Sequence, residues 1–184
     1  MLILNFDPFP VLNTDRLTLR QKTSDDVKEM FFLRSDEGVM KYIARPRARS
    51  LQDAADFIEM VNNAVKNNEY ITWAITLKDD PKPIGSIGLW RTQKENYRAE
   101  LGYVLHPDHH RKGIISEAVK AVLDYGFKTM GLHSVEANIN PANTASEKVL
   151  EKAGFIQEAY FRENYFFDGK FLDSVIYSLI VPKE

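Results

Sequence analysis

The chain has 184 residues, enough for one domain that buries about 70% of the surface its unfolded form exposes. Its formal net charge of −2 and its charged fraction of 27% exclude nucleic acid or an anionic membrane as a generic electrostatic partner. It contains no cysteine, which excludes disulfides and thiol nucleophiles and permits a reducing cytoplasm. No apolar run approaches the about 18 residues of a membrane span, and residues 1–10 lack the basic start and cleavage pattern of a secretion signal. We expect a single cytoplasmic domain over residues 1–184, without repeats or a linker.

The first part of the chain predicts one strand and two helices. Residues 16–20 alternate between apolar and polar side chains, as a strand does. A helix is expected from Ser24 to about Arg34, and a second helix after Ser50. We expect these two helices to border a functional site. The apolar face of the second helix consists of Ala54, Phe57, Ile58, Val61 and Val65.

Residues 71–90 predict a hairpin of two apolar strands joined by a short polar turn. Gly85 and Gly88 lie inside its second strand, where a missing side chain often marks close approach by backbone or by a ligand. Trp73 and Trp90 are expected to pack in the sheet.

A strand over residues 97–105 is followed by a basic turn, residues 109–113, and then by an amphipathic helix of 3.6-residue period. Backbone N–H groups of such a turn and the positive end of the helix dipole converge where an anion can lie. Arg111 and Lys112 add positive charge there. The segment therefore predicts a phosphate-binding turn.

A further strand, residues 135–139, precedes a short helix that Asn143 caps and Gly154 ends. A strand, a helix and a strand in this order imply a parallel pair. The tail predicts a hairpin around Asp168-Gly169. Core packing is expected for most of its aromatic residues, and a pocket or a subunit contact for the rest; they are Tyr160, Phe161, Tyr165, Phe166, Phe167, Phe171 and Tyr177.

Several short motifs occur in a fixed order over nearly the whole chain: Thr14–Arg20, Ala99–Tyr103, Lys112-Gly113 with Ser116–Ala118, Asn143–Ser146, Glu151–Phe155 and Asp168-Gly169. In this order and spacing they resemble the GNAT superfamily of N-acetyltransferases, and within it the RimJ/RimL-like branch that acetylates the N-termini of ribosomal proteins. The resemblance implies an α/β (α+β) GNAT fold. This is a single mixed, mostly antiparallel seven-stranded sheet with a splayed central parallel pair and about four flanking helices. Acetyl-CoA would lie in the opening between the strands that end at Leu105 and Ile139.

The resemblance also implies the residues that bind acetyl-CoA, with no metal. The pantetheine arm would pair like an additional strand with backbone groups near Tyr103, and the pyrophosphate would meet N–H groups of the basic turn. His110 stands where related enzymes usually carry glutamine or arginine, and Ile115 where they often carry glycine or alanine. The implied cofactor-binding residues are Tyr103, Val104, Leu105, His110, Arg111, Lys112, Gly113, Ile114, Ile115, Ser116 and Asn143.

Acetyl transfer requires a base for the amine and a proton for the departing thiolate. Glu100 is the first candidate base, acting through water, and Glu136 on the next strand is the alternative; either could instead be an edge carboxylate paired to a basic residue. Many members of the superfamily use a tyrosine as the acid, but Leu150 occupies that position here. The ribosomal-protein branch uses a serine at the position of Ser146. That hydroxyl could position or relay a proton, or could satisfy only the first turn of its helix.

Two further clusters have a structural and a functional interpretation. His109 and His110 are adjacent and lack a spaced third ligand, so a solvated turn is favoured over a metal site. Arg45, Arg47 and Arg49 crowd a loop where related enzymes contact the acceptor. A solvated charge run is the favoured interpretation, and attraction of an acidic acceptor is the alternative.

The sequence therefore predicts an enzyme that moves the acetyl group directly from acetyl-CoA to a primary amine, most readily a protein or peptide α-amine. Acetylation of a small amine, such as a polyamine, amino acid or antibiotic, is the alternative within enzymes. A non-catalytic acyl-CoA-binding module is the alternative outside them. A homodimer is open, because the strands of the last hairpin could pair with another copy.

Overall fold

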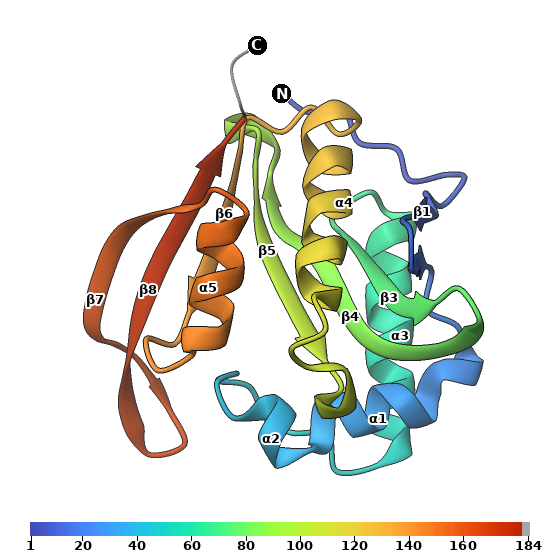
Figure 1. Cartoon of the computed structure of the whole chain (residues 1–184), viewed down its shortest axis with the longest axis horizontal. Coiled ribbons are helices and arrows are strands. Elements are labelled where there is room, and N and C mark those ends of the chain that lie inside the picture. The colour runs from blue at the N-terminus through green and yellow to red at the C-terminus, as the bar shows by residue number, and fades with distance from the viewer. Residues whose placement is uncertain (182–184) are drawn as a thin grey trace.

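The computed structural model describes residues 1–181, which form one eight-stranded sheet in the order β1-β2-β3-β4-β5-β6-β8-β7 (Figure 1). The strands are β1 (Leu12–Asn13), β2 (Leu17–Arg20), β3 (Ile71–Leu77), β4 (Asp80–Gln93), β5 (Arg98–Leu105), β6 (Ser134–Ile139), β7 (Ile156–Phe167) and β8 (Lys170–Ile180). The helices are α1 (Val27–Ser35), α2 (Glu37–Met40), α3 (Leu51–Lys66), α4 (Ile114–Lys128) and α5 (Thr144–Lys152).

The expected mixed fold is confirmed, with one strand more than the seven expected. The additional strand is β1, whose two residues pair with β2 through Leu12 opposite Leu19. Two residues are too few to show an alternating pattern, so a sequence offers no signal for such a strand. The four-residue helix α2 is likewise too short to show a periodic pattern. It brings the number of α-helices in the described chain to five.

The only parallel pair in the described sheet, β5 with β6, is paired over a short length. The register joins Arg98, Ala99 and Glu100 to residues 134–136, and no pairing is found beyond Glu100. Each strand stays bound on its outer side, β5 to β4 as far as Leu105 and β6 to β8 as far as Ile139. The two strands therefore separate after Glu100, as the resemblance implied, and Figure 1 shows them diverging.

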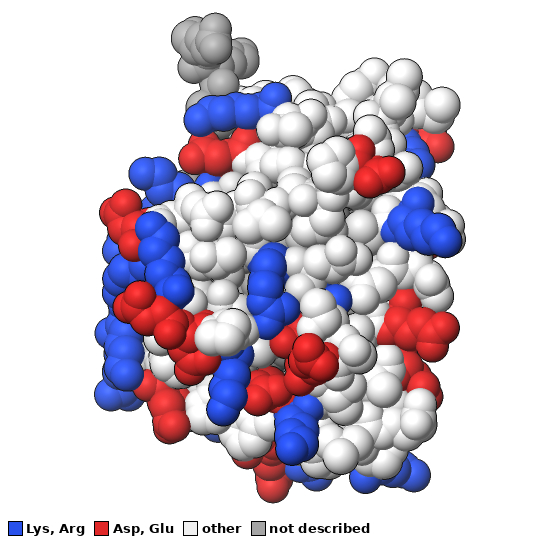
Figure 2. All heavy atoms as spheres, turned by 90° about the vertical axis from the view of Figure 1, so that its right-hand side faces the viewer, with Lys and Arg blue, Asp and Glu red and all other residues white. Residues whose placement is uncertain are grey.

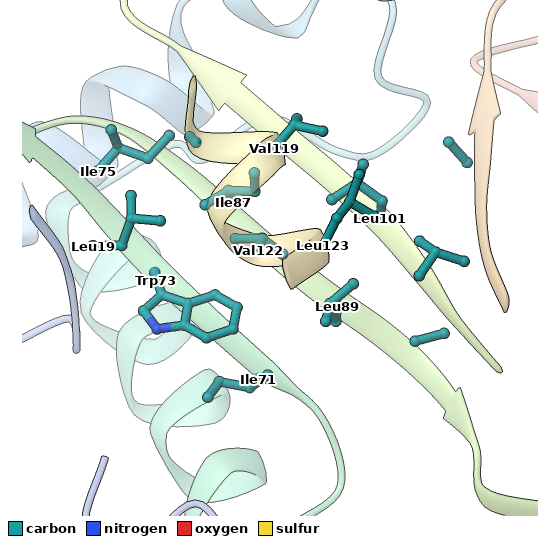
Figure 3. Close-up of a cluster of buried hydrophobic side chains, with 14 of the residues drawn as sticks. Leu19, Ile71, Trp73, Ile75, Ile87, Leu89, Leu101, Val119, Val122 and Leu123 are labelled. Atoms are coloured by element: carbon teal, nitrogen blue, oxygen red, sulfur yellow. The ribbon is translucent and has the colours of Figure 1, made fainter. Parts of the chain in front are cut away.

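Helices cover both faces of the sheet. In Figure 1, α4 and α5 lie in front of the sheet, and α3 lies behind it. The larger buried cluster joins α4 to the central strands; Figure 3 shows Trp73, Leu89 and Leu101 of the sheet packed beneath Val119 and Val122 of the helix. A smaller cluster, Met30, Leu33, Ala54 and Ile58, joins α1 to α3 on the other face, with Val104 of β5 packed against it.

The expectation that most tail aromatics pack in the core is wrong. Tyr177 is buried, but four others are exposed on the β7–β8 hairpin: Tyr160, Phe161, Phe166 and Phe171. The hairpin lies at the edge of the sheet, and β7 pairs only with β8 among the described strands. No helix packs over these four side chains closely enough to bury them, so their exposure follows from the position of the hairpin rather than from its pattern.

The surface carries charges of both signs. On the side of the molecule that bears β1, Figure 2 shows lysine and arginine side chains interspersed with aspartate and glutamate. Among the described residues, no helix has the length and apolar character needed to cross a membrane.

Lys22 is buried in the connection after β2, with 1% of its surface exposed. Its Nζ donates a hydrogen bond to Thr72 Oγ1 over 2.8 Å. Burial lowers the pKa of Lys22 to about 7; the Asp26 carboxylate opposes this shift and the Arg20 guanidinium adds to it. Lys22 therefore changes its charge in the folded protein near neutral pH.

Replacing Lys22 by methionine should remove a pH dependence of stability. The pKa of lysine in an unfolded chain is about 10.4, so between about pH 7 and 10 the unfolded protein binds more protons than the folded one, and the wild type gains stability as pH rises. Lys22→Met lacks this gain. Its free energy of unfolding minus that of the wild type should therefore fall by about 1.4 kcal/mol for each pH unit in this window. Urea unfolding of both proteins at several pH values in this window measures the difference, and a difference independent of pH would contradict the shift.

Candidate active site

A cavity of about 450 Å³ lies where β5 and β6 separate. This volume is typical of a small-molecule site. Its lining comes from β4, β5 and β6 of the sheet, from α1 and α3 with the segment between them, from the start of α5, and from the β7 strand. The two N-terminal helices thus border the site, as the sequence predicted.

Trp90 of β4 lies across two glycines on the cavity side of the sheet. A Cβ atom built on Gly88 would lie 2.9 Å from Trp90 Nε1, and one on Gly102 would lie 3.2 Å from it. Side chains there would push the indole away, so the glycines make room for the ring. From the sequence, Trp90 is expected to pack in the sheet, like Trp73, which is fully buried. Trp90 instead forms part of the cavity lining.

The two candidate bases lie in different surroundings. Glu100 lines the cavity with 15% of its side chain exposed, and its Oε2 accepts a hydrogen bond of 2.8 Å from Arg91 Nη1. Glu136 lies opposite Glu100 in the strand register but does not line the cavity. Its Oε2 accepts a hydrogen bond of 3.0 Å from Arg98 Nε, at the end of the pair where the strands still meet. Both carboxylates are therefore paired with an arginine, as the alternative interpretation expected, but only Glu100 lines the cavity.

Asn143 and Ser146 lie at the start of α5 and line the cavity. Asn143 Oδ1 accepts a hydrogen bond of 3.1 Å from the Ser146 backbone N–H, which confirms that Asn143 caps this helix. Leu150, at the position of the usual tyrosine, is completely buried in the core. Position 150 therefore supplies no hydroxyl group to the cavity.

Tyr103 on β5 supplies a hydroxyl that sequence reasoning assigned no chemical role. The Oη atom of Tyr103 is buried at the cavity and forms no hydrogen bond of acceptable geometry with a described residue. Burial raises the pKa of Tyr103 to about 12, and the nearby Ser146 hydroxyl offsets a part of this shift. The hydroxyl is thus protonated at neutral pH and free to donate.

The basic turn presents free backbone donors beside α4. The backbone N–H groups of residues 111–116 donate no hydrogen bond to any residue within 1–181. Arg111 and Gly113 have φ values of 60° and 73°, and turns of this kind point successive N–H groups to one side. The His110 ring does not face outward for a ligand, because its Nε2 lies 3.0 Å from the Leu105 carbonyl oxygen. The free donors could serve an anion such as a pyrophosphate, which is the role that the resemblance implies for this turn.

Glu117, in the first turn of α4, fixes the basic turn to the N-terminal segment. Its carboxylate accepts hydrogen bonds from Thr14 Oγ1 over 2.5 Å and from Arg16 Nε over 2.7 Å. Arg16 Nη1 donates in turn to the Lys112 carbonyl oxygen over 2.9 Å. Desolvation by itself would raise the pKa of Glu117, but these donors, with that of Thr14 first, lower it overall. The ionised carboxylate thus holds the loop in place.

The other residues implied for the cofactor lie along the open edge and the turn. Val104 lines the cavity, whereas Leu105 is buried at the end of β5. Ile114 is buried under the helix start, and Ile115 and Ser116 are partly exposed. Among residues 1–181, no three histidine, aspartate or glutamate side chains are grouped to hold a metal ion.

The arginines of the loop before α3 do not act as one group. Arg45 lines the cavity, whereas Arg47 lies 3.9 Å from the exposed Glu37 carboxylate and Arg49 is not part of the lining. A second cavity arginine, Arg34, comes from the last turn of α1. Sequence reasoning missed Arg34 because a basic residue at the end of a helix is ordinary there.

Comparison with known proteins agrees with the fold and the site. The sequence model described as acetyltransferase (GNAT) domain matches residues 16–156. The Bacillus subtilis protein named uncharacterized N-acetyltransferase YoaA is 34% identical over 176 residues, which cover 96% of this chain and 99% of the relative. The crystal structure of a GNAT-family acetyltransferase from Bacillus anthracis superposes with a TM-score of 0.83 at 30% identity, over 93% of this chain and 98% of the other.

More distant relatives carry names with different acceptors. Spermidine N(1)-acetyltransferase of Vibrio cholerae is 25% identical over 86% of this chain and 89% of its own. RimL, a ribosomal L7/L12 α-N-protein acetyltransferase solved in complex with coenzyme A, shares the fold with a TM-score of 0.85 at 16% identity, over 94% of this chain and 98% of its own. The family match removes the alternative of a non-catalytic module. The chain therefore belongs to the GNAT acetyltransferase family and is an acetyl-CoA-dependent N-acetyltransferase.

Proposed function

We propose that this enzyme acetylates the α-amine of a peptide or protein in the cytoplasm. The observation that carries the proposal is the separation of β5 from β6 after Glu100. It creates one cavity onto which Glu100, Tyr103 and Ser146 all face. A base, a protonated hydroxyl and a helix start thus surround one space, as acyl transfer to an amine requires.

The donor would bind along the open edge of β5. Backbone groups beyond Glu100 have no neighbouring strand on that side, and the amides of a pantetheine arm can satisfy them. The N–H groups of residues 111–116 would bind the pyrophosphate. Acetyl-CoA then supplies a thioester at the inner end of the cavity, whose acetyl group passes to the amine as the carbon–sulfur bond breaks.

The residues of the cavity would manage the protons of this step. Glu100, directly or through a water, would accept the proton that the amine loses as its nitrogen bonds to the acetyl carbon. Tyr103 would donate its proton to the departing thiolate, with Ser146 beside it to position or relay. The tyrosine recovers a proton from solvent before the next turnover.

A small amine is the second candidate, favoured by the similarity to a spermidine acetyltransferase. The charges that line the cavity oppose a polyamine. They are the cations of Arg34, Arg45 and Arg91 against the single carboxylate of Glu100, a formal charge of 3 − 1 = +2. A polyamine is itself a cation at neutral pH, so we favour an α-amine whose neighbouring groups are not cationic.

Incubation of the protein with acetyl-CoA and an amine panel tests the proposal. We expect thiol release with peptides that carry a free α-amine, a mass gain of one acetyl group on that amine, and little reaction with spermidine. Thiol release with spermidine alone, or with no amine at all, would refute the acceptor class.

Glu100→Gln should lower kcat by about 10²- to 10⁴-fold, because the general base is lost. The exposed Glu59, on α3, provides a matched control as Glu59→Gln.

Tyr103→Phe should remove the proton donor without disturbing the fold. We expect a fall in kcat of about 10²-fold with an unchanged Kd for acetyl-CoA, since the ring remains. Tyr125, which is partly buried on α4 and lies outside the cavity lining, serves as the control in Tyr125→Phe. Stopped-flow detection of free thiol at several pH values measures the step. If Tyr103→Phe leaves kcat unaltered, Tyr103 is not the proton donor and the role falls to Ser146. Ser146→Ala is then the corresponding variant.

Glu117→Gln should loosen the basic turn, because the ionised acceptor of Thr14 and Arg16 is lost. Charge-assisted hydrogen bonds of this kind contribute about 1.5–3 kcal/mol, so the Kd for acetyl-CoA should rise by about tenfold or more. Asp124→Asn, at an exposed ion pair on the same helix, is the control. Calorimetric titration with acetyl-CoA decides the matter, and equal affinities for the two variants would show that Glu117 does not support the turn.

A further inference from the structure

We propose that Arg34 and Arg45 form a subsite for an anionic group of the acceptor, a carboxylate or a phosphate close to the amine that is acetylated. This inference rests on the proposed function and specifies its substrate class. It follows from two guanidinium groups that line one cavity and have no counterion.

Arg34 is held in a position from which it can bind an anionic ligand, and no carboxylate of residues 1–181 pairs with it. Its Nε atom is buried and has no hydrogen-bond partner within residues 1–181. The guanidinium carbon lies 3.9 Å from the centre of the Phe57 ring, so the flat group is stacked on an aromatic face. Burial, and then the charge of Arg45, lower the pKa of Arg34. A cation without a partner in such surroundings is costly, and a ligand anion would relieve that cost.

Arg45 reaches the same space from the segment between α2 and α3. Its guanidinium carbon lies 5.9 Å from the centre of the Trp90 ring, and Phe57 and Trp90 are themselves stacked with centroids 6.4 Å apart. The segment is tied to α1 by a hydrogen bond of 2.9 Å from the Ala48 N–H to the Arg34 carbonyl oxygen. The two arginines thus stand on one aromatic platform of Phe57 and Trp90.

No carboxylate of the described chain neutralises this pair. Neither Arg34 nor Arg45 forms an ion pair with any of residues 1–181. Asp53 is near enough to raise the pKa of Arg34 in part, but its Oδ2 accepts backbone hydrogen bonds at the start of α3. Glu100, the only acidic residue of the lining, is paired with Arg91. The positive charge of the platform is therefore left for a ligand.

The geometry favours a particular chemistry. A guanidinium presents parallel N–H donors that match the two oxygens of a carboxylate or phosphate. Trp90 lies opposite Glu100 in the strand register, so the platform adjoins the proposed base. An acceptor could then place its amine at Glu100 and its anion on the arginines. The sources of such an anion are an acidic side chain next to the terminal residue of a peptide and the acidic group of a small amino acid.

Matched peptides test the subsite with the wild-type enzyme. The peptides have the same length and a serine α-amine, and differ only in a glutamate, a glutamine or a lysine at the second position. We expect kcat/KM to be at least about tenfold higher for glutamate than for glutamine, and lower still for lysine. The preference should shrink between about 50 mM and 500 mM NaCl, because salt screens the attraction. Free glutamate and phosphoserine, assayed in parallel, distinguish a small acidic acceptor from a peptide.

Variants assign the preference to the two arginines. Arg34→Gln and Arg45→Gln should each reduce the ratio of kcat/KM for the glutamate peptide to kcat/KM for the glutamine peptide to within about twofold, while the Kd for acetyl-CoA stays at the wild-type value. Arg47→Gln and Arg49→Gln, in the same loop but outside the cavity lining, should keep the full ratio. Retained acetyl-CoA affinity shows that a variant is folded.

The outcomes separate this inference from the proposed function. Acetylation of all three peptides with equal kcat/KM would overturn the anionic subsite and leave the proposed acetylation of peptide α-amines intact. A preference that survives in Arg34→Gln and Arg45→Gln would overturn the assignment to these residues. Absence of thiol release with every peptide and small amine would overturn the proposed function itself.

Discussion

The separation of two neighbouring parallel strands is the constraint on which the rest of this structure depends. β5 and β6 are hydrogen-bonded only as far as Glu100 and its partner in the register, Glu136. Each strand is held on its outer side by an antiparallel neighbour, so neither can bend back to close the gap. The inner edges keep backbone donors and acceptors that require a partner. Glu100 stands at the branch point, and Tyr103 follows within the open part.

The site combines two kinds of recognition at the two ends of this opening. At one end, the backbone N–H groups of residues 111–116 donate to no described residue, and in the proposed function they bind the pyrophosphate through the peptide unit rather than through particular side chains. Binding of this kind would tolerate His110 and Ile115 at positions where related enzymes differ. At the other end, side chains from several elements meet, and a change in any one of them alters the acceptor that fits.

Features that depend on local sequence were predictable, and those that depend on distant packing were not. The Asn143 cap, the amphipathic α4 and the Asp168-Gly169 turn, with φ values of 49° and 77°, follow from neighbouring residues. The parallel pair follows from the order of elements. The role of Arg34 depends on Phe57, which lies on another helix, and the place of Trp90 depends on a glycine of the next strand. The exposure of the tail aromatics depends on which elements fail to cover the last hairpin.

The bracing of the basic turn from the N-terminal segment has a consequence for how this protein can be divided. The stretch that matches the family runs from residue 16 to residue 156. Thr14, which donates to Glu117, precedes it, and Tyr165, which lines the cavity, follows it. A fragment trimmed to the matched stretch would contain β5 and β6 but lose β8, which holds β6 on its outer side, together with a brace at one end of the opening and a wall at the other. The part of the chain that forms the complete site is thus longer than the stretch that matches the family.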